Sequence, residues 1–140
     1  MYKCKYFTIK ELVNPAFLKM TDETILWKVF DDRLLRAADK IRDMYGAIII
    51  NGGSLTDCGL RLDDSKTGAK FSAHKYGRAL DLHIVEIEKK GLSKDAKITE
   101  YKKIRKELLQ ISEFNNLSFE TGIYWLHIDT FNRSNRLFNP

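Results

Sequence analysis

Histidine and aspartate residues gather in two short segments of the 140-residue sequence, SAHKYGRALDLH at 72–83 and WLHIDT at 125–130. All three histidines of the chain lie in these segments. Imidazole nitrogens and carboxylate oxygens are ligands of zinc, and a catalytic zinc ion commonly has three protein ligands and one open position. The crowding therefore suggests a zinc site. The alternative is that these are hydrogen-bonded structural residues of ordinary strands.

Both segments alternate as β-strands do, with successive side chains on opposite faces. In ALDLHIV, Asp81 and His83 share one face, and leucine and isoleucine form the other. In WLHIDTF, His127 and Asp129 likewise share a face. If the two strands are neighbours, four ionisable groups converge on one side of the sheet. His74, just ahead of the first strand, could supply a third ligand from the loop.

Hydrophobic periodicity and turn residues indicate the elements that must position these segments. Apolar residues recur at intervals of three and four from 23 to 45, which predicts the main core helix, and a second helix is predicted near 97–113. AIIIN at 47–51 predicts a buried strand, and an irregular loop over 52–72 follows, of a length that tends to be functional. The predicted fold is α+β: a small antiparallel sheet with helices packed on one face and the zinc site on the other.

Length and composition predict a single domain over residues 1–140, because 44% hydrophobic residues are enough for one core. Cys4 and Cys58 are far apart and outside any CxxC pair, so free thiols are expected. The net charge of +5 favours polyanions, but the basic residues are mixed with acids, as on a solvated surface. With neither a signal-peptide pattern nor a membrane-length apolar run, we expect synthesis in the cytoplasm.

The same residues resemble a known family. SAHKYGRALD reads as SxHxxGxAxD, and WLHIDT supplies a late histidine. Together these motifs are similar to those of peptidase family M15, the zinc D-Ala-D-Ala carboxypeptidases and murein endopeptidases, over roughly residues 47–131. INGGSLTDCGLR also resembles a family segment that ends in an SGYR-like turn. The resemblance implies a carboxypeptidase and hedgehog-like fold and one Zn²⁺ ion bound by His74, Asp81 and His127.

The resemblance also implies roles for residues around the metal. Arg61 would bind the substrate carbonyl or stabilise the developing oxyanion, and Ser72 would help to hold a substrate carboxylate or backbone. The alternatives are a solvent-exposed loop arginine and a serine with a turn or cap role. His83 is a candidate hydrogen-bond donor near the ligands, an oxyanion stabiliser or an alternative ligand. Tyr124 is a candidate substrate-binding residue or a packing residue of its strand.

The sequence leaves two candidates for the residue that acts as the general base. Many members have glutamate three residues before the last histidine, where this chain has Tyr124. The candidates are Asp129, which shares the face of His127, and Glu120, if the 119–123 segment folds back. Asp129 could instead accept a hydrogen bond from His127 and fix its tautomer. A GIY turn before the last strand is similar to the branch of the family found in phage proteins and murein endopeptidases.

We expect a zinc-dependent peptidase that hydrolyses peptide bonds of bacterial peptidoglycan, as a D,D-carboxypeptidase or an endopeptidase. It would be a phage or prophage lysin or a virion component that acts on the cell wall, with stem peptides as partners. We expect a monomer and no nucleic-acid or membrane partner. One alternative is a non-catalytic, zinc-stabilised binding module of the same fold. Another is a nucleic-acid-binding protein that uses the positive net charge.

Overall fold

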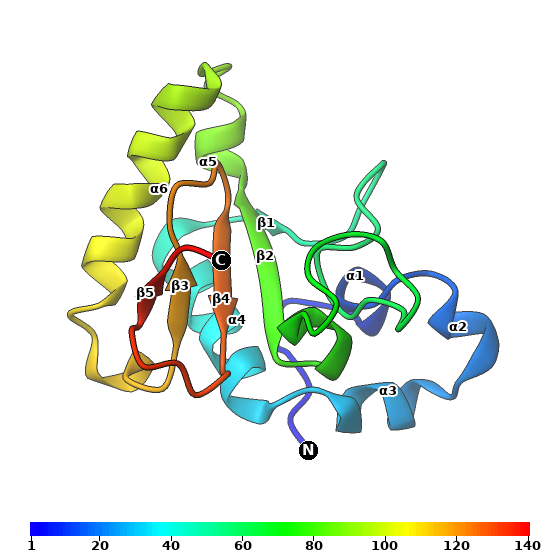
Figure 1. Cartoon of the computed structure of the whole chain (residues 1–140). Helices are drawn as coiled ribbons and strands as arrows, with labels where there is room; N and C mark the ends of the chain where they lie inside the picture. Colours follow the sequence, from blue (N-terminus) through cyan, green and yellow to red (C-terminus); the bar gives the residue numbers. More distant parts are fainter.

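A five-stranded sheet in the order β1-β2-β4-β3-β5 lies at the centre of the computed structural model, which describes all residues 1–140 (Figure 1). The strands are β1 (Ile48–Ile49), β2 (Ala79–Ile84), β3 (Ser118–Glu120), β4 (Leu126–Asp129) and β5 (Leu137–Phe138). Neighbouring strands are antiparallel except β3 and β5, which are parallel. The sheet is therefore mixed, and the prediction of a purely antiparallel sheet is wrong at this edge. Because β2 and β3 occupy both edges of β4, the returning chain does not pair with β4 and instead pairs with the outer edge of β3.

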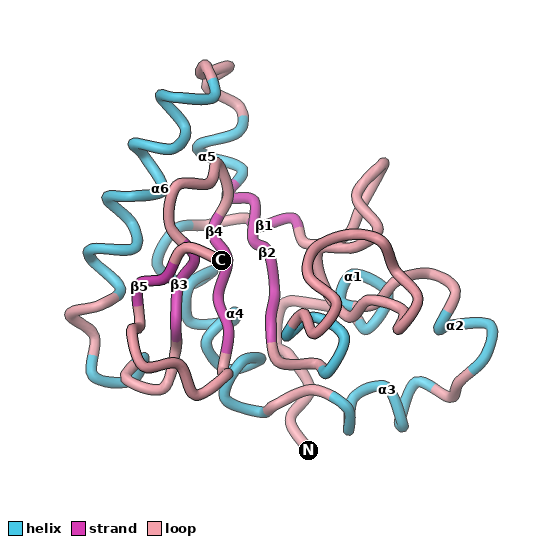
Figure 2. Tube along the Cα trace, in the orientation of Figure 1, coloured by secondary structure: helices cyan, strands magenta, loops and turns pink.

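Helices and loops surround this sheet (Figure 2). The helices are α1 (Ile9–Leu12), α2 (Phe17–Met20), α3 (Glu23–Val29), α4 (Asp32–Tyr45), α5 (Val85–Glu88) and α6 (Lys94–Leu108), with 3-10 helices η1 (Ala73–Tyr76) and η2 (Ser112–Phe114). The long helix α4 passes behind the sheet, and α6 runs along its side (Figure 1). No helix is both long and apolar enough to cross a membrane. The overall class is α+β, as predicted.

The predicted core helix over 23–45 is two helices, α3 and α4, which meet at Phe30 and Asp31. Phe30 has extended backbone angles, and the Asp31 side chain accepts a hydrogen bond from the backbone N–H of Arg33, which caps α4. The backbone N–H of Asp31 donates to the carbonyl of Gly77 at 3.1 Å. The spacing of buried apolar residues continues across this break, through Trp27, Phe30 and Leu34, so periodicity alone does not reveal the break.

The hydrophobic core lies between the apolar faces of the strands and the helices. Leu80, Leu82 and Ile84 of β2 are fully buried and belong to one cluster with residues of α4 and α6. Tyr101 of α6 ties its helix to the sheet, because its hydroxyl accepts a hydrogen bond from the backbone N–H of Ile84 at 3.0 Å. With this face of β2 in the core, the alternate side chains, including Asp81, point to the opposite face.

Candidate metal centre

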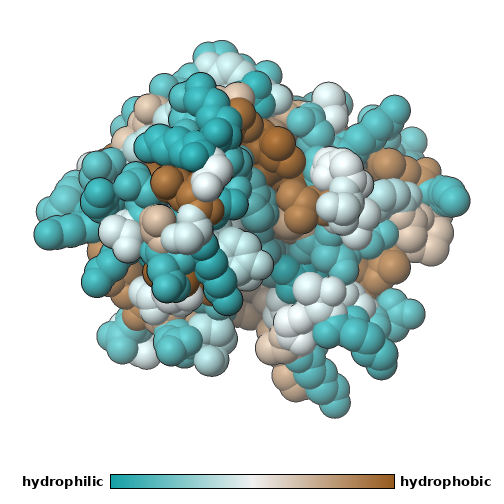
Figure 3. All heavy atoms as spheres, turned by 90° about the horizontal axis from the view of Figure 1, so that it is seen from above, coloured by the Kyte–Doolittle hydropathy of each residue, from teal (hydrophilic) through white to brown (hydrophobic).

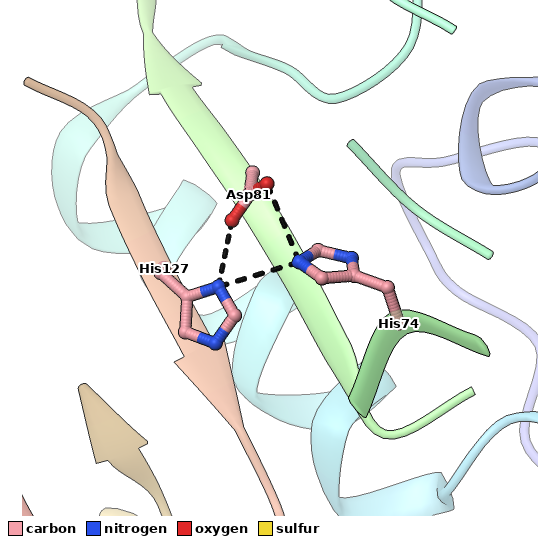
Figure 4. A group of neighbouring side chains, drawn as sticks. All are labelled: His74, Asp81 and His127. Carbon is pink, nitrogen blue, oxygen red and sulfur yellow. Dashed lines mark hydrogen bonds and ion pairs between the residues drawn. The ribbon is translucent and has the colours of Figure 1, made fainter. Parts of the chain in front are cut away.

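The register of the sheet brings Asp81 and His127 together. β2 and β4 pair with these two residues directly opposite each other, and Asp81 Oδ1 lies 2.7 Å from His127 Nδ1. His74 comes from η1, and its Nε2 lies 3.3 Å from both Asp81 Oδ2 and His127 Nδ1 (Figure 4). All three side chains are buried, and one ligand atom from each lies within 4.8 Å of the others. The predicted convergence of His74, Asp81 and His127 is confirmed, and this buried group could hold a metal ion.

Hydrogen bonds behind the two histidines fix which ring nitrogen faces the centre. His74 Nδ1 lies 3.0 Å from the carbonyl oxygen of Gly59, which can only accept, so Nδ1 carries the hydrogen and Nε2 keeps its lone pair. His127 lies between two carboxylates, with Nε2 3.2 Å from Asp129 Oδ2 and Nδ1 2.7 Å from Asp81 Oδ1. With a metal ion on Nδ1, Nε2 would carry the hydrogen and donate it to Asp129. Metal-binding histidines are typically oriented in this way by a carbonyl or a carboxylate.

The charges of the site favour a cation at its centre. Burial opposes protonation of His127, but hydrogen bonds to Asp129 and Asp81 raise its pKa to about 9. Burial likewise opposes ionisation of Asp81, yet the two histidines hold the pKa of this carboxyl well below its usual range. Without a metal ion, a hydrogen on His127 Nδ1 can lie between that ring and Asp81, while the lone pair of His74 Nε2 faces the same point. A bound metal ion would satisfy all three side chains, so the residues present fit one.

The short helix that carries His74 ends at Gly77, which has a left-handed backbone conformation. Gly77 ends η1 with φ +64°, and a Cβ there would lie 2.5 Å from the carbonyl oxygen of Val29 at the end of α3. A side chain at this position would therefore clash with backbone as well as strain the turn. On the other side, the backbone N–H of Arg61 donates to the carbonyl of His74 at 3.2 Å. The SxHxxGxAxD spacing thus corresponds to a short helix and a tight turn that lead into β2.

A cleft of about 600 Å³ opens in front of the three candidate ligands. Seen from above, the surface is hollowed between two lobes (Figure 3). Most of residues 67–74, which include part of the long loop, line the cleft together with His127 of β4 and the C-terminal segment. Arg61 also lines it and is almost fully buried, with Nη2 3.0 Å from Asp81 Oδ2 and Nε 2.5 Å from the carbonyl oxygen of Asp57. The predicted neighbours of the metal, Arg61 and Ser72, therefore share one cavity with the ligands.

Glu120 lines the same cleft from the neighbouring strand. β3 pairs with β4 through Ser118 opposite Asp129 and Phe119 opposite Ile128, so one further step places Glu120 opposite His127. Its Oε2 lies 4.0 Å from His127 Nδ1. Burial raises the pKa of the Glu120 carboxyl, which moves this group toward the range of a general base at neutral pH. The condition set for Glu120, that the 119–123 segment fold back, is met because β3 pairs with β4.

Asp129 lies behind His127 and not in the cleft. It is fully buried, and its Oδ2 contacts His127 Nε2 and accepts a hydrogen bond from Arg133 Nε at 2.9 Å. The ligand nitrogen Nδ1 is on the other side of the imidazole ring. Of the two predicted roles for Asp129, this geometry favours the acceptor that fixes the tautomer over the general base.

His83 and Tyr124 are not brought into the cleft. His83 lies two residues along β2 from Asp81, with Nε2 3.7 Å from Cys58 Sγ and Nδ1 3.7 Å from Glu88 Oε1. The ring of Tyr124 packs edge-on against Trp125, with Lys94 over its face. The geometry therefore gives no support to a catalytic His83 or a substrate-binding Tyr124. Cys58 is a free thiol, as expected, and so is Cys4.

No model of a protein family, no curated protein and no solved structure matches this chain. The chemistry of the side chains in and around the cleft is therefore the basis for any functional proposal.

Several residues of the cleft had no role in the sequence-based prediction, among them Trp125, Arg133 and Phe138. Trp125 lines the cleft and directly precedes β4. Arg133 follows β4 in an irregular segment, and its guanidinium carbon lies 3.7 Å from the ring centre of Phe138. The Phe138 ring in turn lies edge-on to His127, with ring centres 5.8 Å apart. No periodic pattern marks residues 130–138, so only the strand pairing of β5 could reveal them.

Proposed function

We propose that this protein is a zinc-dependent peptidase that hydrolyses peptide bonds of bacterial peptidoglycan, as the M15-like motifs suggest. The observation that carries the proposal is the position of Glu120, a partly buried carboxylate beside a His74–Asp81–His127 group and exposed to the same cleft. A metal-binding triad with a nearby carboxylate that faces a cavity is the arrangement that metal-assisted hydrolysis requires. A purely structural metal site would more commonly be closed by a fourth protein ligand.

The residues of the cleft have separate roles in this proposal. A bound zinc ion would polarise the scissile carbonyl and lower the pKa of the attacking water. Glu120 accepts the proton of that water and passes it to the leaving amine. Arg61 is held by Asp81 and by the carbonyl of Asp57, and in this proposal its remaining N–H groups donate to the carbonyl oxygen of the substrate.

The cleft suits a peptide with anionic groups. Arg61 and Arg133 supply positive charge, while Trp125, Phe131 and Phe138 supply aromatic surface. Stem peptides of peptidoglycan carry several free carboxylates, which arginine binds well. The choice of peptidoglycan, and of a phage or prophage role at the cell wall, rests on the motif resemblance.

The test is a digest of purified peptidoglycan and of soluble stem peptides, with zinc or with a chelator, read by mass spectrometry. We expect a chelator-sensitive loss of D-alanine or of a cross-link. Glu120→Gln should lower kcat by about 10²–10⁴-fold and retain one zinc ion per chain, because it removes only the proton acceptor. Glu113→Gln, a change at an exposed glutamate, is the matched control and should leave kcat unchanged. A fully active Glu120→Gln would refute the assignment of the base.

The second candidate function is a non-catalytic, metal-stabilised binding module. The observation in its favour is Tyr124, which stands where many M15 members have their glutamate. In this case the protein would bind one zinc ion and stem peptides but release no product from any of them. The same digest separates the two functions, provided that zinc content is measured on the same sample.

A further inference from the structure

A second cavity, of about 380 Å³, has four arginines in its walls. Arg33 comes from the first turn of α4, Arg78 from the residue before β2, and Arg133 and Arg136 from the segment between β4 and β5. Three distant parts of the sequence thus bring guanidinium groups to one cavity. The rest of the lining is mainly neutral and polar, and no aspartate or glutamate is part of it. We call this cavity the arginine pocket.

The positive charge of the arginine pocket is only partly balanced. Asp31 pairs with both Arg33 and Arg78, at 2.6 Å in each case, and Asp129 pairs with Arg133. Arg136 donates to the backbone carbonyls of Leu117 and Phe114, which carry no net charge. Four guanidiniums against two carboxylates leave two positive charges in excess. Each guanidinium also has five N–H donors, so donors remain for a ligand.

The arginine pocket adjoins the metal cleft. Phe131 and Arg133 line both cavities. Asp129 Oδ2 contacts both His127 of the metal site and Arg133. A ligand that extends from the metal centre past Phe131 would therefore meet the four arginines.

We propose that the arginine pocket binds a carboxylate of the same peptide whose scissile bond lies in the metal cleft. This inference rests on the proposed peptidase function for the identity of the ligand. Planar guanidiniums bind carboxylates through paired N–H···O bonds, and such charge-assisted bonds are stronger than neutral ones. The pocket would then select peptides with a free carboxylate at a fixed distance from the cleaved bond and discriminate against amidated ones.

The first experiment measures anion binding without cleavage. Tricarballylate, a small tricarboxylate, is titrated into ¹⁵N-labelled protein, and the arginine Nε–H signals are followed by NMR. We expect saturable shifts in the wild type and binding weaker by about tenfold or more in Arg33→Gln/Arg78→Gln, which removes two charge-assisted donors. Lys19→Gln/Lys28→Gln, which also removes two positive charges, at exposed residues of α2 and α3, is the charge-matched control and should bind as the wild type does. Equal binding by the wild type and the double variant would overturn the proposal.

A second double variant separates binding from folding. Arg33→Lys/Arg78→Lys keeps both charges and leaves Asp31 with cationic partners, but it removes the paired guanidinium geometry. We expect its affinity to lie between those of the wild type and the glutamine variant. The lysine variant could instead bind as weakly as the glutamine variant, with a lower unfolding temperature than the wild type in both. The loss of binding would then be due to a disrupted fold, and this result would count against the proposal.

The second experiment compares two stem peptides that differ only in one carboxylate, free or amidated. We expect the wild type to cleave the free form with a kcat/KM about tenfold higher, and this preference to fall toward one in Arg33→Gln/Arg78→Gln. Cleavage without any preference would refute the arginine pocket and leave the peptidase intact. If neither peptide is cleaved, the proposed function fails, while the tricarballylate titration still tests the pocket.

Discussion

Replacement of Asp129 by asparagine tests how a residue behind the ligands controls the metal site. Asp129 is fully buried, and its Oδ2 contacts His127 Nε2 at 3.2 Å and Arg133 Nε at 2.9 Å. Its Oδ1 accepts from the backbone N–H of Phe131 at 3.1 Å. The carboxylate thus accepts three hydrogen bonds and donates none. Asparagine has nearly the same shape but replaces one acceptor with an NH₂ group.

Either orientation of the new amide weakens the site. If the NH₂ group faces His127, it favours the tautomer with hydrogen on Nδ1, which removes the lone pair that the metal needs. If it faces Phe131 instead, the backbone N–H loses its acceptor, at a cost of about 1–3 kcal/mol. Loss of such a partner of a metal-binding histidine typically lowers metal affinity by about 10–100-fold, or about 1.4–2.8 kcal/mol. We expect a decrease of that size for Asp129→Asn.

The assay is competition for zinc with a chromophoric chelator at neutral pH. Asp31→Asn is the matched control, because Asp31 is also well buried and paired with arginine but lies outside the metal site. We expect the control to keep the wild-type dissociation constant for zinc. A dissociation constant for Asp129→Asn within twofold of the wild type would refute the role of Asp129 in holding His127.

Three further predictions concern the ligands and the frame around them. His74→Ala should abolish stoichiometric zinc in metal analysis, and near-normal zinc content would contradict the ligand assignment. Asp31→Asn should lower the free energy of unfolding by about 1–2 kcal/mol at pH 7, because bonds to Arg33 and Arg78 are lost. Burial opposes ionisation of Asp31, but those bonds hold its pKa below the value of about 3.9 in unfolded chains. The difference in free energy of unfolding between wild type and variant should therefore shrink as pH falls below 4, as measured by urea titration. A difference that stays constant with pH would exclude the mechanism. Gly77→Ala should lower the free energy of unfolding by about 2–4 kcal/mol in the same assay, because a Cβ would lie 2.5 Å from a backbone oxygen and the residue has a positive φ. A decrease of less than about 1 kcal/mol would contradict this expectation and mean that the turn relaxes.

The part of the site prediction that the structure confirms came mainly from the alternation of side chains along the strands. The period of two in ALDLHIV and WLHIDTF was enough to place Asp81 and His127 on a common face, and pairing of β2 with β4 then makes them direct neighbours. Long helices with strong periodicity were also recognised, although the break at Asp31 was missed. That break depends on a tertiary contact, the hydrogen bond from Asp31 to the carbonyl of Gly77, which leaves no periodic signal in the sequence.

The short outer strands could not be predicted. β3 and β5 have only three and two residues, which is too few for alternation to be recognised. β3 pairs with the free edge of β4, and β5 then pairs with the free edge of β3, so both pairings depend on contacts between residues distant in sequence. The parallel pairing of β5 with β3 and the wall that Phe138 adds to the cleft follow from that edge.

The position of Glu120 explains how a peptidase site could lack the glutamate three residues before its last histidine. A residue at that spacing, here Tyr124, precedes β4 and turns toward Lys94, away from the cleft. Glu120 instead reaches His127 across the sheet, so that Asp81, His127 and Glu120 form one row over β2, β4 and β3. In the proposed mechanism the base is thus supplied by strand register and not by local spacing. A shift of β3 by one residue would turn Glu120 into the core and remove the base, while all three candidate ligands would stay in place.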